Sequence, residues 1–335
     1  MEIEWWQRGR RTTPRVKRVT KRLREHYVVT VTLVRDYGFG KPSDQRIHTD
    51  FFIPARHLGG ATEGDKVLVT LEQWDDPRDQ PIGRVVQVLG QEGEHEVEMH
   101  AILAEFGLPY QFPAEVEEAA KAFAPSDADN PHGLDPAEVT RRRDFREVLT
   151  MTIDPADAKD FDDALSMQKL ENGNWEVGVH IADVTHYLIP GSVLDREAVQ
   201  RATSVYLVDR TIPMLPEVLS NDLCSLRPHE DRFAFSAVFE MTSEAEVVGR
   251  WFGRTVIHSD RRFAYEEAQE RLETGEGDRA EELKVLGELA TKLRNKRFKR
   301  GGIDFNTEEV RFQLDEAGKP LRVVIKRMKE ANKLI

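Results

Sequence analysis

The segment between residues 154 and 163 constrains this chain more than any other, because it carries five aspartates within ten residues. An apolar strand pattern, residues 148–153, directly precedes it. Carboxylates held within about 4–6 Å of one another raise each other's pKa, so a fold that gathers them needs a compensating positive charge. Hard oxygen ligands suit Mg2+ or Mn2+, and such a cation can in turn bind phosphate. The segment therefore predicts a metal-dependent phosphodiesterase site.

Two other interpretations of this acidic segment have to be weighed. An acid-rich turn is often a solvated loop, and the spacing alone leaves that interpretation open. A calcium-binding loop beginning at Asp160 would need glycine at its sixth position and a ligand at its fifth, where the chain has Leu165 and Ala164. The calcium interpretation therefore fails. The apolar neighbours Ile153 and Phe161 favour a metal site, because they would hold the acids close to a hydrophobic core.

Several further motifs accompany the acidic segment, and together they resemble one known family. The run from Thr152 to Ser166 resembles the catalytic motif of the ribonuclease II / ribonuclease R family of exoribonucleases. More stretches resemble motifs of the same family in the same order: residues 179–184, 191–195, 201–207, 212–216 and 219–226. The resemblance extends from about residue 27 to the C-terminus and is closest to the ribonuclease R branch.

The resemblance implies a multidomain chain, with an all-β cold-shock barrel of the OB type followed by an α+β catalytic domain of the RNB type. The expected divisions are a basic N-terminal segment (1–26), the barrel (27–91), a helical connector and linker (92–140) and the catalytic domain (141–335). Residues 14–20 resemble the last strand of a preceding cold-shock domain, and residues 327–335 resemble the start of a family helix that normally continues. We therefore expect an incomplete catalytic domain and a chain with weak or no activity alone.

The activity implied by the resemblance is 3'-to-5' hydrolysis of single-stranded RNA to nucleoside 5'-monophosphates, with Mg2+ or Mn2+ as cofactor. The acids at the family's four catalytic positions are Asp154, Asp160, Asp162 and Asp163. The resemblance implies metal binding chiefly through Asp154, Asp160 and Asp163, and a role for Asp162 in the cleavage step and in holding the terminal nucleotide. Asp157 lies outside the family pattern and is interpreted as a surface residue. The alternative is a non-catalytic RNA-binding protein that uses the barrel, although intact acids at all four positions argue against it.

Two aromatic residues match family positions that stack on the 3'-terminal bases of RNA, namely Tyr206 and Phe305. Stacking tolerates any base, which suits an enzyme that degrades strands of any sequence. Without the resemblance, either ring would be interpreted as a core residue. His180 and His186 flank an apolar strand and are interpreted as structural, and Cys224 is interpreted as a small buried hydrophobe.

A series of short strand-like runs in the first part of the sequence predicts the β-barrel. Strand-like runs are separated by turn residues and fall at residues 27–33, 50–53, 66–71 and 82–89. Short strands with frequent turns are typical of OB-type barrels. The alternation of residues along a strand places Phe51 inside the barrel.

Two stretches of the predicted barrel, residues 37–40 and 50–54, resemble the RNA-binding motifs of cold-shock domains. Phe39 and Phe52 are therefore candidates for stacking on bases, worth roughly 1–3 kcal/mol per base. Lys41 stands where the family usually has a second aromatic residue. It would weaken the stacking platform but keep affinity for phosphate.

Composition limits the remaining possibilities. The net charge of -12 argues against a uniformly basic nucleic-acid binder, so RNA contacts must be local. Basic stretches within residues 8–24 and 292–300 are candidates, and each is equally open to being a solvated face. The single cysteine excludes a disulfide framework within the chain and suits the reducing cytoplasm. No apolar run approaches the roughly 20 residues of a membrane span. Single-stranded RNA is the expected partner, and no protein partner is indicated.

Overall fold

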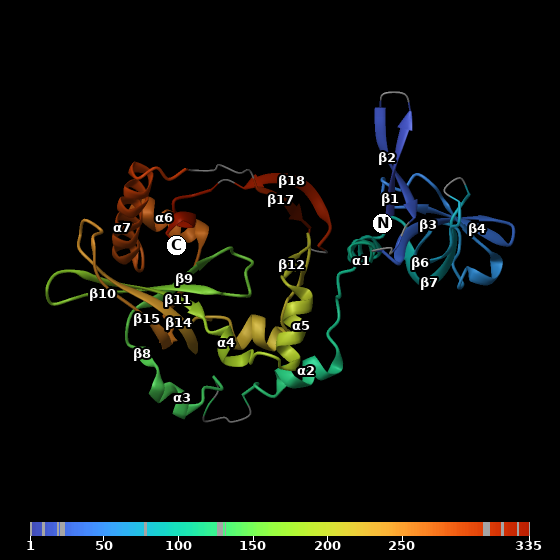
Figure 1. Cartoon of the computed structure of the whole chain (residues 1–335). Helices are drawn as coiled ribbons and strands as arrows, with labels where there is room; N and C mark the ends of the chain where they lie inside the picture. Colours follow the sequence, from blue (N-terminus) through green and yellow to red (C-terminus); the bar gives the residue numbers. More distant parts are fainter. Residues whose placement is uncertain are drawn as a thin grey trace. The chain divides into compact units, whose positions relative to one another are not determined.

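The computed structural model describes residues 2–8, 11–18, 20, 24–76, 79–125, 130, 132–303, 309–315, 318–326 and 328–334. The chain divides into two compact units, Met1–Tyr110 and Gln111–Ile335. Figure 1 labels helices and strands of both units and colours the chain along its sequence. The division falls inside the segment expected to be a connector. The domain bounds inferred from the sequence stay a prediction.

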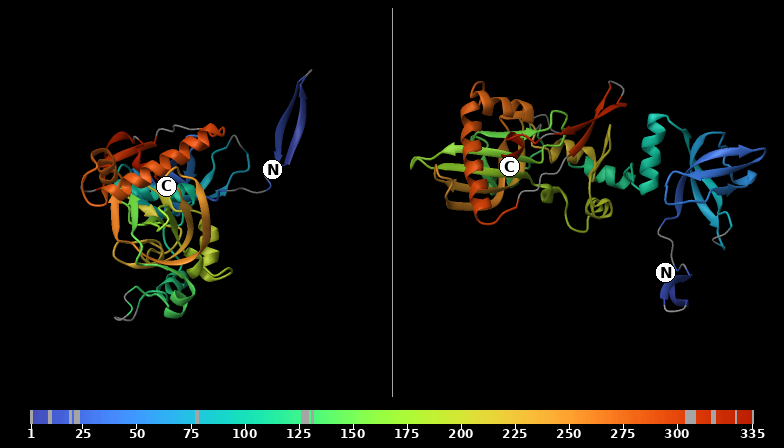
Figure 2. Two further views of the ribbon diagram at one scale, coloured as in Figure 1. Left: turned by 90° about the vertical axis from the view of Figure 1, so that its left-hand side faces the viewer. Right: turned by 90° about the horizontal axis from the view of Figure 1, so that it is seen from above.

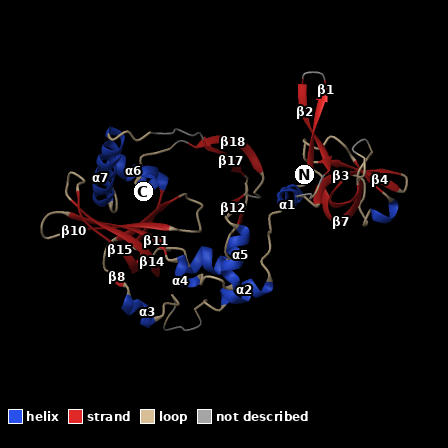
Figure 3. Ribbon diagram, viewed as in Figure 1, coloured by secondary structure: helices blue, strands red, loops and turns tan. Residues whose placement is uncertain are grey.

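A closed barrel of five strands forms the centre of the first unit, as the sequence predicted. Its strands are β3 (His26–Val34), β4 (Tyr37–Pro42), β5 (Phe51–Ile53), β6 (Asp65–Gln73) and β7 (Ile82–Gln91). They are hydrogen-bonded in the order β3-β4-β5-β7-β6, and Figure 3 shows the strands curving around one another. The strand-like runs 27–33, 66–71 and 82–89 lie within β3, β6 and β7, and the run 50–53 overlaps β5, which begins at Phe51. The fold class predicted for this part of the chain is therefore confirmed.

Alternation along the strands separates the barrel core from its outer surface. Phe51 is 1% exposed, as predicted, and it packs in the core with Val29 and Ile53. Gly40 allows β4 to approach this core, because a Cβ added there would lie only 2.5 Å from Val29 Cγ2. Any side chain at position 40 would push β4 away from β3. The neighbouring residue Phe52 is half-buried and belongs to the outer surface.

Two further elements complete the first unit. The strands β1 (Glu2–Arg8) and β2 (Arg11–Arg18) pair in an antiparallel hairpin. The helix α1 (His95–Phe106) packs on β3, β6 and β7 and buries Val97 and Leu103. It ends at Gly107, whose positive φ of 65° is the left-handed conformation that glycine adopts at little cost.

A mixed sheet of seven strands organises the second unit, in the order β16-β9-β10-β11-β14-β15-β8. Its strands are β8 (Arg143–Phe145), β9 (Thr150–Asp154), β10 (Asp163–Lys169), β11 (Trp175–Ala182), β14 (Asp231–Met241), β15 (Val247–His258) and β16 (Arg261–Ala264). The two outer pairings, β16 with β9 and β15 with β8, are parallel, and the inner pairings are antiparallel. The predicted α+β class is confirmed.

Helices cover both faces of this sheet. The helical elements are α2 (Ala114–Lys121), α3 (Pro136–Arg141), α4 (Val184–Tyr187), α5 (Val193–Arg201), the π-helix η2 (Leu219–Leu223), α6 (Tyr265–Thr274), α7 (Ala280–Lys299) and the 3-10 helix η3 (Ala331–Lys333). In Figure 1, α6 and α7 lie on one side of the strands and α4 and α5 on the other. In the view from above, α7 extends across the sheet (Figure 2).

The two faces have separate hydrophobic cores. In β10, Ala164 belongs to the core shared with α2, α4, α5 and η2, whereas the next residue, Leu165, belongs to the core shared with α6 and α7. This alternation is what a strand buried on both faces requires. Three leucines of α7, Leu283, Leu286 and Leu289, supply most of the helical side of the second core.

Several smaller features complete the second unit. Strand β11 ends at Ala182, and Asp183 is the N-cap of the short helix α4. The strands β17 (Glu309–Leu314) and β18 (Pro320–Lys326) pair in an antiparallel hairpin. Two short strands, β12 (Val205–Tyr206) and β13 (Thr211–Ile212), form a separate pair. Throughout the described part of the chain, no helix is both long and apolar enough to cross a membrane.

Candidate active site

The four predicted acids all belong to the connection between β9 and β10. Asp154 is the last residue of β9, Asp163 is the first residue of β10, and Asp160 and Asp162 lie in the loop between them. Because β9 and β10 are antiparallel neighbours, these ends meet at the same edge of the sheet. Asp157 is exposed, in agreement with its interpretation as a surface residue.

Backbone hydrogen bonds from distant segments fix the second half of this loop. The Ala182 amide donates to the carbonyl of Asp162 (2.9 Å), and the Leu226 amide donates to the carbonyl of Phe161 (2.8 Å). The Ser225 hydroxyl accepts the Phe161 amide (2.9 Å) and donates to the carbonyl of Lys159 (3.2 Å). The acids are therefore presented by an ordered backbone rather than by a solvated turn.

An arginine of β16 fixes the first half of the loop. Arg262 donates from Nη2 to the carbonyls of Pro155 (2.6 Å) and Ala156 (3.0 Å). The guanidinium also lies over the ring of Phe161, 5.5 Å from its centroid. Its positive charge acts against the rise in the pKa of Asp154. Arg262 thus supplies part of the positive charge that the acidic segment needs.

The positive charge of Arg262 does not fully compensate the negative charges of the acids. Burial, together with the charges of Asp163 and Asp162, raises the pKa of Asp154 to about 6. Desolvation, together with Asp160 and Asp163, raises the pKa of Asp162 to about 6. Desolvation also raises the pKa of Asp163. Such shifts mark sites where an additional cation would be strongly stabilised.

The chemistry of these donors fits a divalent cation. Asp154 is 8% exposed, and its Oδ2 atom has no hydrogen-bond partner. A buried carboxylate oxygen without a partner is costly unless a ligand satisfies it, and carboxylate oxygens are what Mg2+ and Mn2+ prefer. Among the described residues, no three His, Cys, Asp or Glu side chains are already gathered closely enough to hold a metal ion.

Of the two aromatic residues predicted to stack on RNA, Tyr206 lies beside the acids. Its hydroxyl donates to Asp160 Oδ2 at 3.0 Å, while its ring is 66% exposed. Desolvation and the charge of Asp160 raise the pKa of the Tyr206 hydroxyl to about 12, so it remains a donor at neutral pH. The ring is thus free to contact a ligand at the edge where the acids lie. Phe305 falls outside the described residues.

Three residues around the acids were missed by sequence reasoning. Ser225 lies in the stretch 219–226 that resembles a family motif, but the resemblance gave it no role. Arg262 contacts the loop from a position far away in the chain, where no local pattern signals it. Tyr265, the first residue of α6, follows directly after Ala264, which pairs with Asp154. Burial and the charges of Asp154 and Asp163 raise the pKa of its hydroxyl. Parallel pairing of β16 with β9 is what brings it there, and that pairing cannot be deduced from a four-residue strand.

A cluster of three aromatic rings lies on the outer surface of the barrel. Phe39 and Phe52 are directly paired across β4 and β5, with ring centroids 6.0 Å apart. Tyr37 lies 5.7 Å from Phe39 and 5.5 Å from Phe52. Tyr37 is therefore a third member of this surface, and its spacing of two residues from Phe39 was the signal for it. Lys41 continues the same face of β4 and is exposed.

The second basic stretch, at the end of α7, is largely engaged in the fold. Lys292 donates to the Ser243 carbonyl (2.6 Å), and Lys296 donates to the carbonyls of Glu244 (2.7 Å) and Ala245 (3.0 Å). These contacts attach α7 to the turn between β14 and β15. Lys292 and Lys296 therefore make contacts within the fold, which neither of the two interpretations of this stretch predicted. The first basic stretch, within residues 8–24, falls partly outside the described residues.

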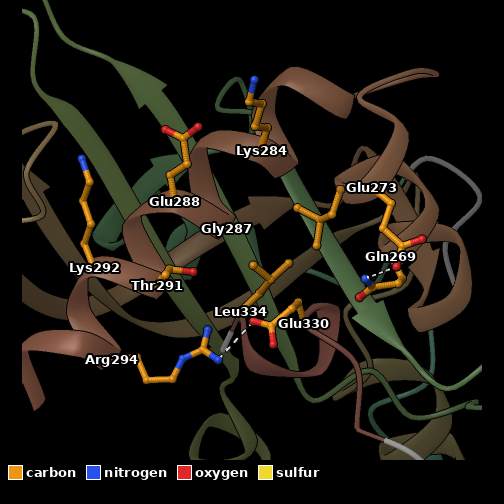
Figure 4. A pocket seen from close by; sticks show the side chains of 11 residues that line it. Gln269, Glu273, Lys284, Gly287, Glu288, Thr291, Lys292, Arg294, Glu330 and Leu334 are labelled. Carbon is orange, nitrogen blue, oxygen red and sulfur yellow. Dashed lines mark hydrogen bonds and ion pairs between the residues drawn. The ribbon is translucent and has the colours of Figure 1, made fainter. Parts of the chain in front are cut away.

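A groove of about 450 Å³ lies elsewhere in the second unit, between α6, α7 and η3. Figure 4 shows its mixed rim, in which Lys284 and Glu288 of α7 face outward and Arg294 pairs with Glu330 at 3.2 Å. None of the predicted site residues lines it. Concavity alone therefore does not identify the candidate site in this protein.

Comparison with family models and curated proteins identifies the domains of this chain. A family model for the RNB domain matches residues 142–335, and one for the cold shock domain matches residues 39–113. Ribonuclease R of Thermotoga maritima is 38% identical over 329 residues, which cover 96% of this chain and 45% of that protein. Human exosome complex exonuclease RRP44 is 36% identical over 297 residues, covering 88% of this chain and 30% of that protein. The chain thus spans less than half the length of these relatives.

Comparison with solved structures extends the likeness to the fold. RNase R of Mycoplasma genitalium in complex with ribose methylated single-stranded RNA matches with a TM-score of 0.88 at 23% identity, covering 99% of this chain and 53% of that one. Yeast Ssd1, described as a pseudonuclease, matches with a TM-score of 0.62 at 21% identity, covering 86% of this chain and 36% of that one. The match of the RNB model to more than half of the chain carries the assignment. This chain belongs to the RNB-domain family, as its motifs predicted.

Proposed function

We propose that this chain carries the acidic catalytic centre of a 3'-to-5' exoribonuclease that hydrolyses single-stranded RNA to nucleoside 5'-monophosphates. The observation that carries the proposal is the placement of the four acids in one loop at one sheet edge, where Asp154 Oδ2 has no partner and burial, together with neighbouring carboxylates, raises the pKa of Asp154 and Asp162. The similarity to Thermotoga maritima ribonuclease R supports the same reaction. Because the chain spans only part of that protein, activity of the chain alone is a separate question for experiment.

Asp154, Asp160 and Asp163 are the residues that would hold Mg2+ or Mn2+. Their side chains would turn toward a shared ion, since no described cluster of three is closed before binding. Such an ion, when bound, polarises the phosphate and lowers the pKa of a bound water. The ordered loop contacts from Ala182, Ser225 and Arg262 reduce the entropy lost when these carboxylates are brought together.

Asp162 is the candidate proton acceptor of the reaction. Its side chain is exposed and its pKa is raised to about 6, which suits a general base near neutral pH. A water oxygen would form a bond to phosphorus while Asp162 takes a proton of that water. The bond from phosphorus to the 3'-oxygen of the preceding nucleotide would break, the departing 3'-oxygen would take a proton from solvent water, and Asp162 would then return its proton to solvent. The products are a nucleoside 5'-monophosphate and an RNA that ends in a new 3'-hydroxyl.

The remaining predicted residues serve RNA binding in this proposal. Tyr206 would hold the 3'-terminal nucleotides beside Asp160, and Phe305 is proposed for the same task on the strength of the family resemblance. In the barrel, Phe39 and Phe52 would stack on bases while Lys41 contacts phosphate. The domains proposed for these tasks are residues 27–91 and 141–335, and the cytoplasm is the proposed location, in keeping with one buried cysteine.

The direct test follows RNA degradation. We would replace the matching region of Thermotoga maritima ribonuclease R with this chain, and assay both the chimera and the chain itself on single-stranded RNA with Mg2+. A 5'-labelled RNA should shorten progressively from its 3' end, and a uniformly labelled RNA should release nucleoside 5'-monophosphates. Asp162→Asn in the chimera should abolish this release, whereas Asp157→Asn in the exposed part of the same loop should not.

The same test decides between the enzyme and its rival. Binding of RNA by the chimera without any Mg2+-dependent cleavage would support a non-catalytic RNA-binding protein, the role suggested by the fold shared with the pseudonuclease Ssd1. Internal fragments, or release of nucleotides from the 5' end, would contradict the proposed polarity.

A further inference from the structure

The buried hydroxyl of Ser225 contacts the chain on both sides of Asp160, one of the candidate metal-binding residues. Ser225 is 0% exposed, and its Oγ atom contacts the residues on both sides of Asp160. It accepts the amide of Phe161 at 2.9 Å and donates to the carbonyl of Lys159 at 3.2 Å. The orientation of the Asp160 backbone therefore depends on a hydroxyl that comes from a segment about sixty residues further along the chain.

An almost completely buried arginine holds that segment in turn. Arg232 of β14 is 2% exposed, and its Nε atom donates to the carbonyls of Asp222 (3.1 Å) and Ser225 (3.2 Å). Its Nη2 atom pairs with Asp222 Oδ1 (2.7 Å) and with the Glu230 carboxylate. Charge-assisted bonds of this kind are stronger than neutral ones and fix geometry. The sheet strand β14 is thereby connected to the acidic loop through Ser225.

We infer that Ser225, held by Arg232, is a positioning residue for Asp160 in the candidate metal site. The inference rests on the proposed function and deepens it. Asp160 has two supports: Ser225 fixes its backbone, and the Tyr206 hydroxyl fixes its side chain (3.0 Å). Residues that orient a metal ligand typically change metal affinity or activity by about 10–100-fold when they are replaced.

The chain offers a matched control for this inference. Ser259 is also 0% exposed, but its hydroxyl has no hydrogen-bond partner and so makes no hydrogen bond to the acidic loop. Ser225→Ala and Ser259→Ala remove the same atom from equally buried positions. If the loss of a buried hydroxyl affected only the stability of the fold, the two variants would not differ in their affinity for Mn2+.

The experiment measures Mn2+ affinity of the full chain by electron paramagnetic resonance, and kcat and KM for RNA in the chimera. Ser225→Ala should weaken Mn2+ binding and lower kcat by about 10-fold or more, with KM for RNA changed less than about 2-fold. Ser259→Ala should change none of the three. A Ser225→Ala protein that binds Mn2+ and turns over like the Ser259→Ala control would overturn the inference.

A second variant keeps the test decisive if Ser225→Ala does not fold. Asp222→Asn removes the charge from the partly exposed partner of the Arg232 guanidinium and leaves the apolar core unchanged. The weaker ion pair should hold Ser225 less firmly and lower Mn2+ affinity by a few-fold. Unchanged Mn2+ affinity in a folded Asp222→Asn protein would then count against the role of Ser225. Failure of the proposed function looks different, because the unmodified chain would bind no Mn2+ at the acids and the unmodified chimera would release no nucleotides.

Discussion

The acidic loop and the aromatic surface of the barrel are built on different principles. The rings of Tyr37, Phe39 and Phe52 are brought together by strand alternation and by one pairing between neighbouring strands. The acids depend on contacts from far along the chain, including Ser225 and Arg262. A binding surface that tolerates any base needs only local order, whereas a site that must hold an ion and a reacting phosphate needs its loop fixed from several directions.

A second contrast lies within the sheet of the second unit. His180 is fully buried, and burial lowers its pKa to about 4, yet both of its ring nitrogens have partners in Ser166 (2.8 Å) and Ser236 (2.6 Å). Asp154 is almost as buried, but one of its oxygens has no partner. A satisfied buried group supports structure, and an unsatisfied one awaits a ligand.

The largest effect on RNA hydrolysis is expected from replacing Asp162, the candidate acid that is not proposed to bind the metal. Asp162→Asn should lower RNA hydrolysis by the chimera by about 10³-fold or more, because the amide cannot accept the proton of the attacking water. RNA affinity, measured by fluorescence anisotropy, should change little. If Asp162→Asn weakened RNA binding and left turnover intact, the acidic loop would resemble the barrel surface, and the contrast between the two regions would fail.

A large effect on stability is expected from Asp154→Asn. The pKa of Asp154 is raised from 3.8 to about 6 in the folded chain, so the stability available while it is protonated at low pH is lost as pH rises through 6. Asn at this position imitates the protonated form, and in EDTA at pH 7 it should raise the free energy of unfolding by about 2 kcal/mol. The gain should disappear near pH 4, and urea denaturation at both pH values measures it.

Asp157→Asn serves as the control for that measurement, because Asp157 is exposed. Equal unfolding free energies for Asp154→Asn and the unmodified chain at pH 7 would show that the charge of Asp154 does not destabilise the fold.

The contribution of His180 to stability should depend on pH in the opposite sense. Its lowered pKa means that its contribution to stability is present above about pH 6.5 and is lost as pH falls toward 4.

A smaller effect is expected on the barrel. Phe39→Ala should weaken binding of single-stranded RNA by the chain about 10-fold, since a stacked base contributes roughly 1–3 kcal/mol. Mn2+ affinity should be unchanged. Phe106→Ala removes another exposed ring of the first unit, on α1, and should leave RNA affinity as it is. If Phe106→Ala and Phe39→Ala had equal effects, the three-ring surface would have no special role.

The smallest effect is expected from Lys41→Ala. Loss of one phosphate contact should weaken RNA binding only a few-fold at moderate salt and reduce the salt dependence of log Kd by about 0.7. Measuring Kd over a range of KCl concentrations separates this effect from stacking. A salt dependence identical to that of the unmodified chain would place Lys41 outside the RNA-binding surface.

The parts of this molecule that the sequence predicted are those with short-range signals. Strand alternation was enough to place Phe51 in the barrel core. The motifs were enough to predict the family and the α+β fold. The twelve-residue strand β15 was missed, because several of its residues, including Phe252, are apolar yet exposed and its pattern is irregular.

The support of the candidate site was beyond reach of the sequence for a physical reason. Ser225, Arg232 and Tyr265 act through contacts that exist only once β9, β14 and β16 are assembled. Ser225 belongs to a motif-like stretch, but that stretch does not reveal its contacts with the acidic loop. Arg232 and Tyr265 carry no local signature. The positions of the acids therefore depend on contacts between segments that are far apart in the sequence.

The most direct measurement is a crystal structure of the chain with Mn2+, using anomalous scattering to locate the ion. Our account predicts a strong peak at the β9–β10 edge, with carboxylate oxygens of Asp154, Asp160 and Asp163 turned toward it at about 2.1–2.2 Å, as expected for a hard divalent ion. A structure at saturating Mn2+ with no ion at this edge, and with these carboxylates still apart, would contradict it.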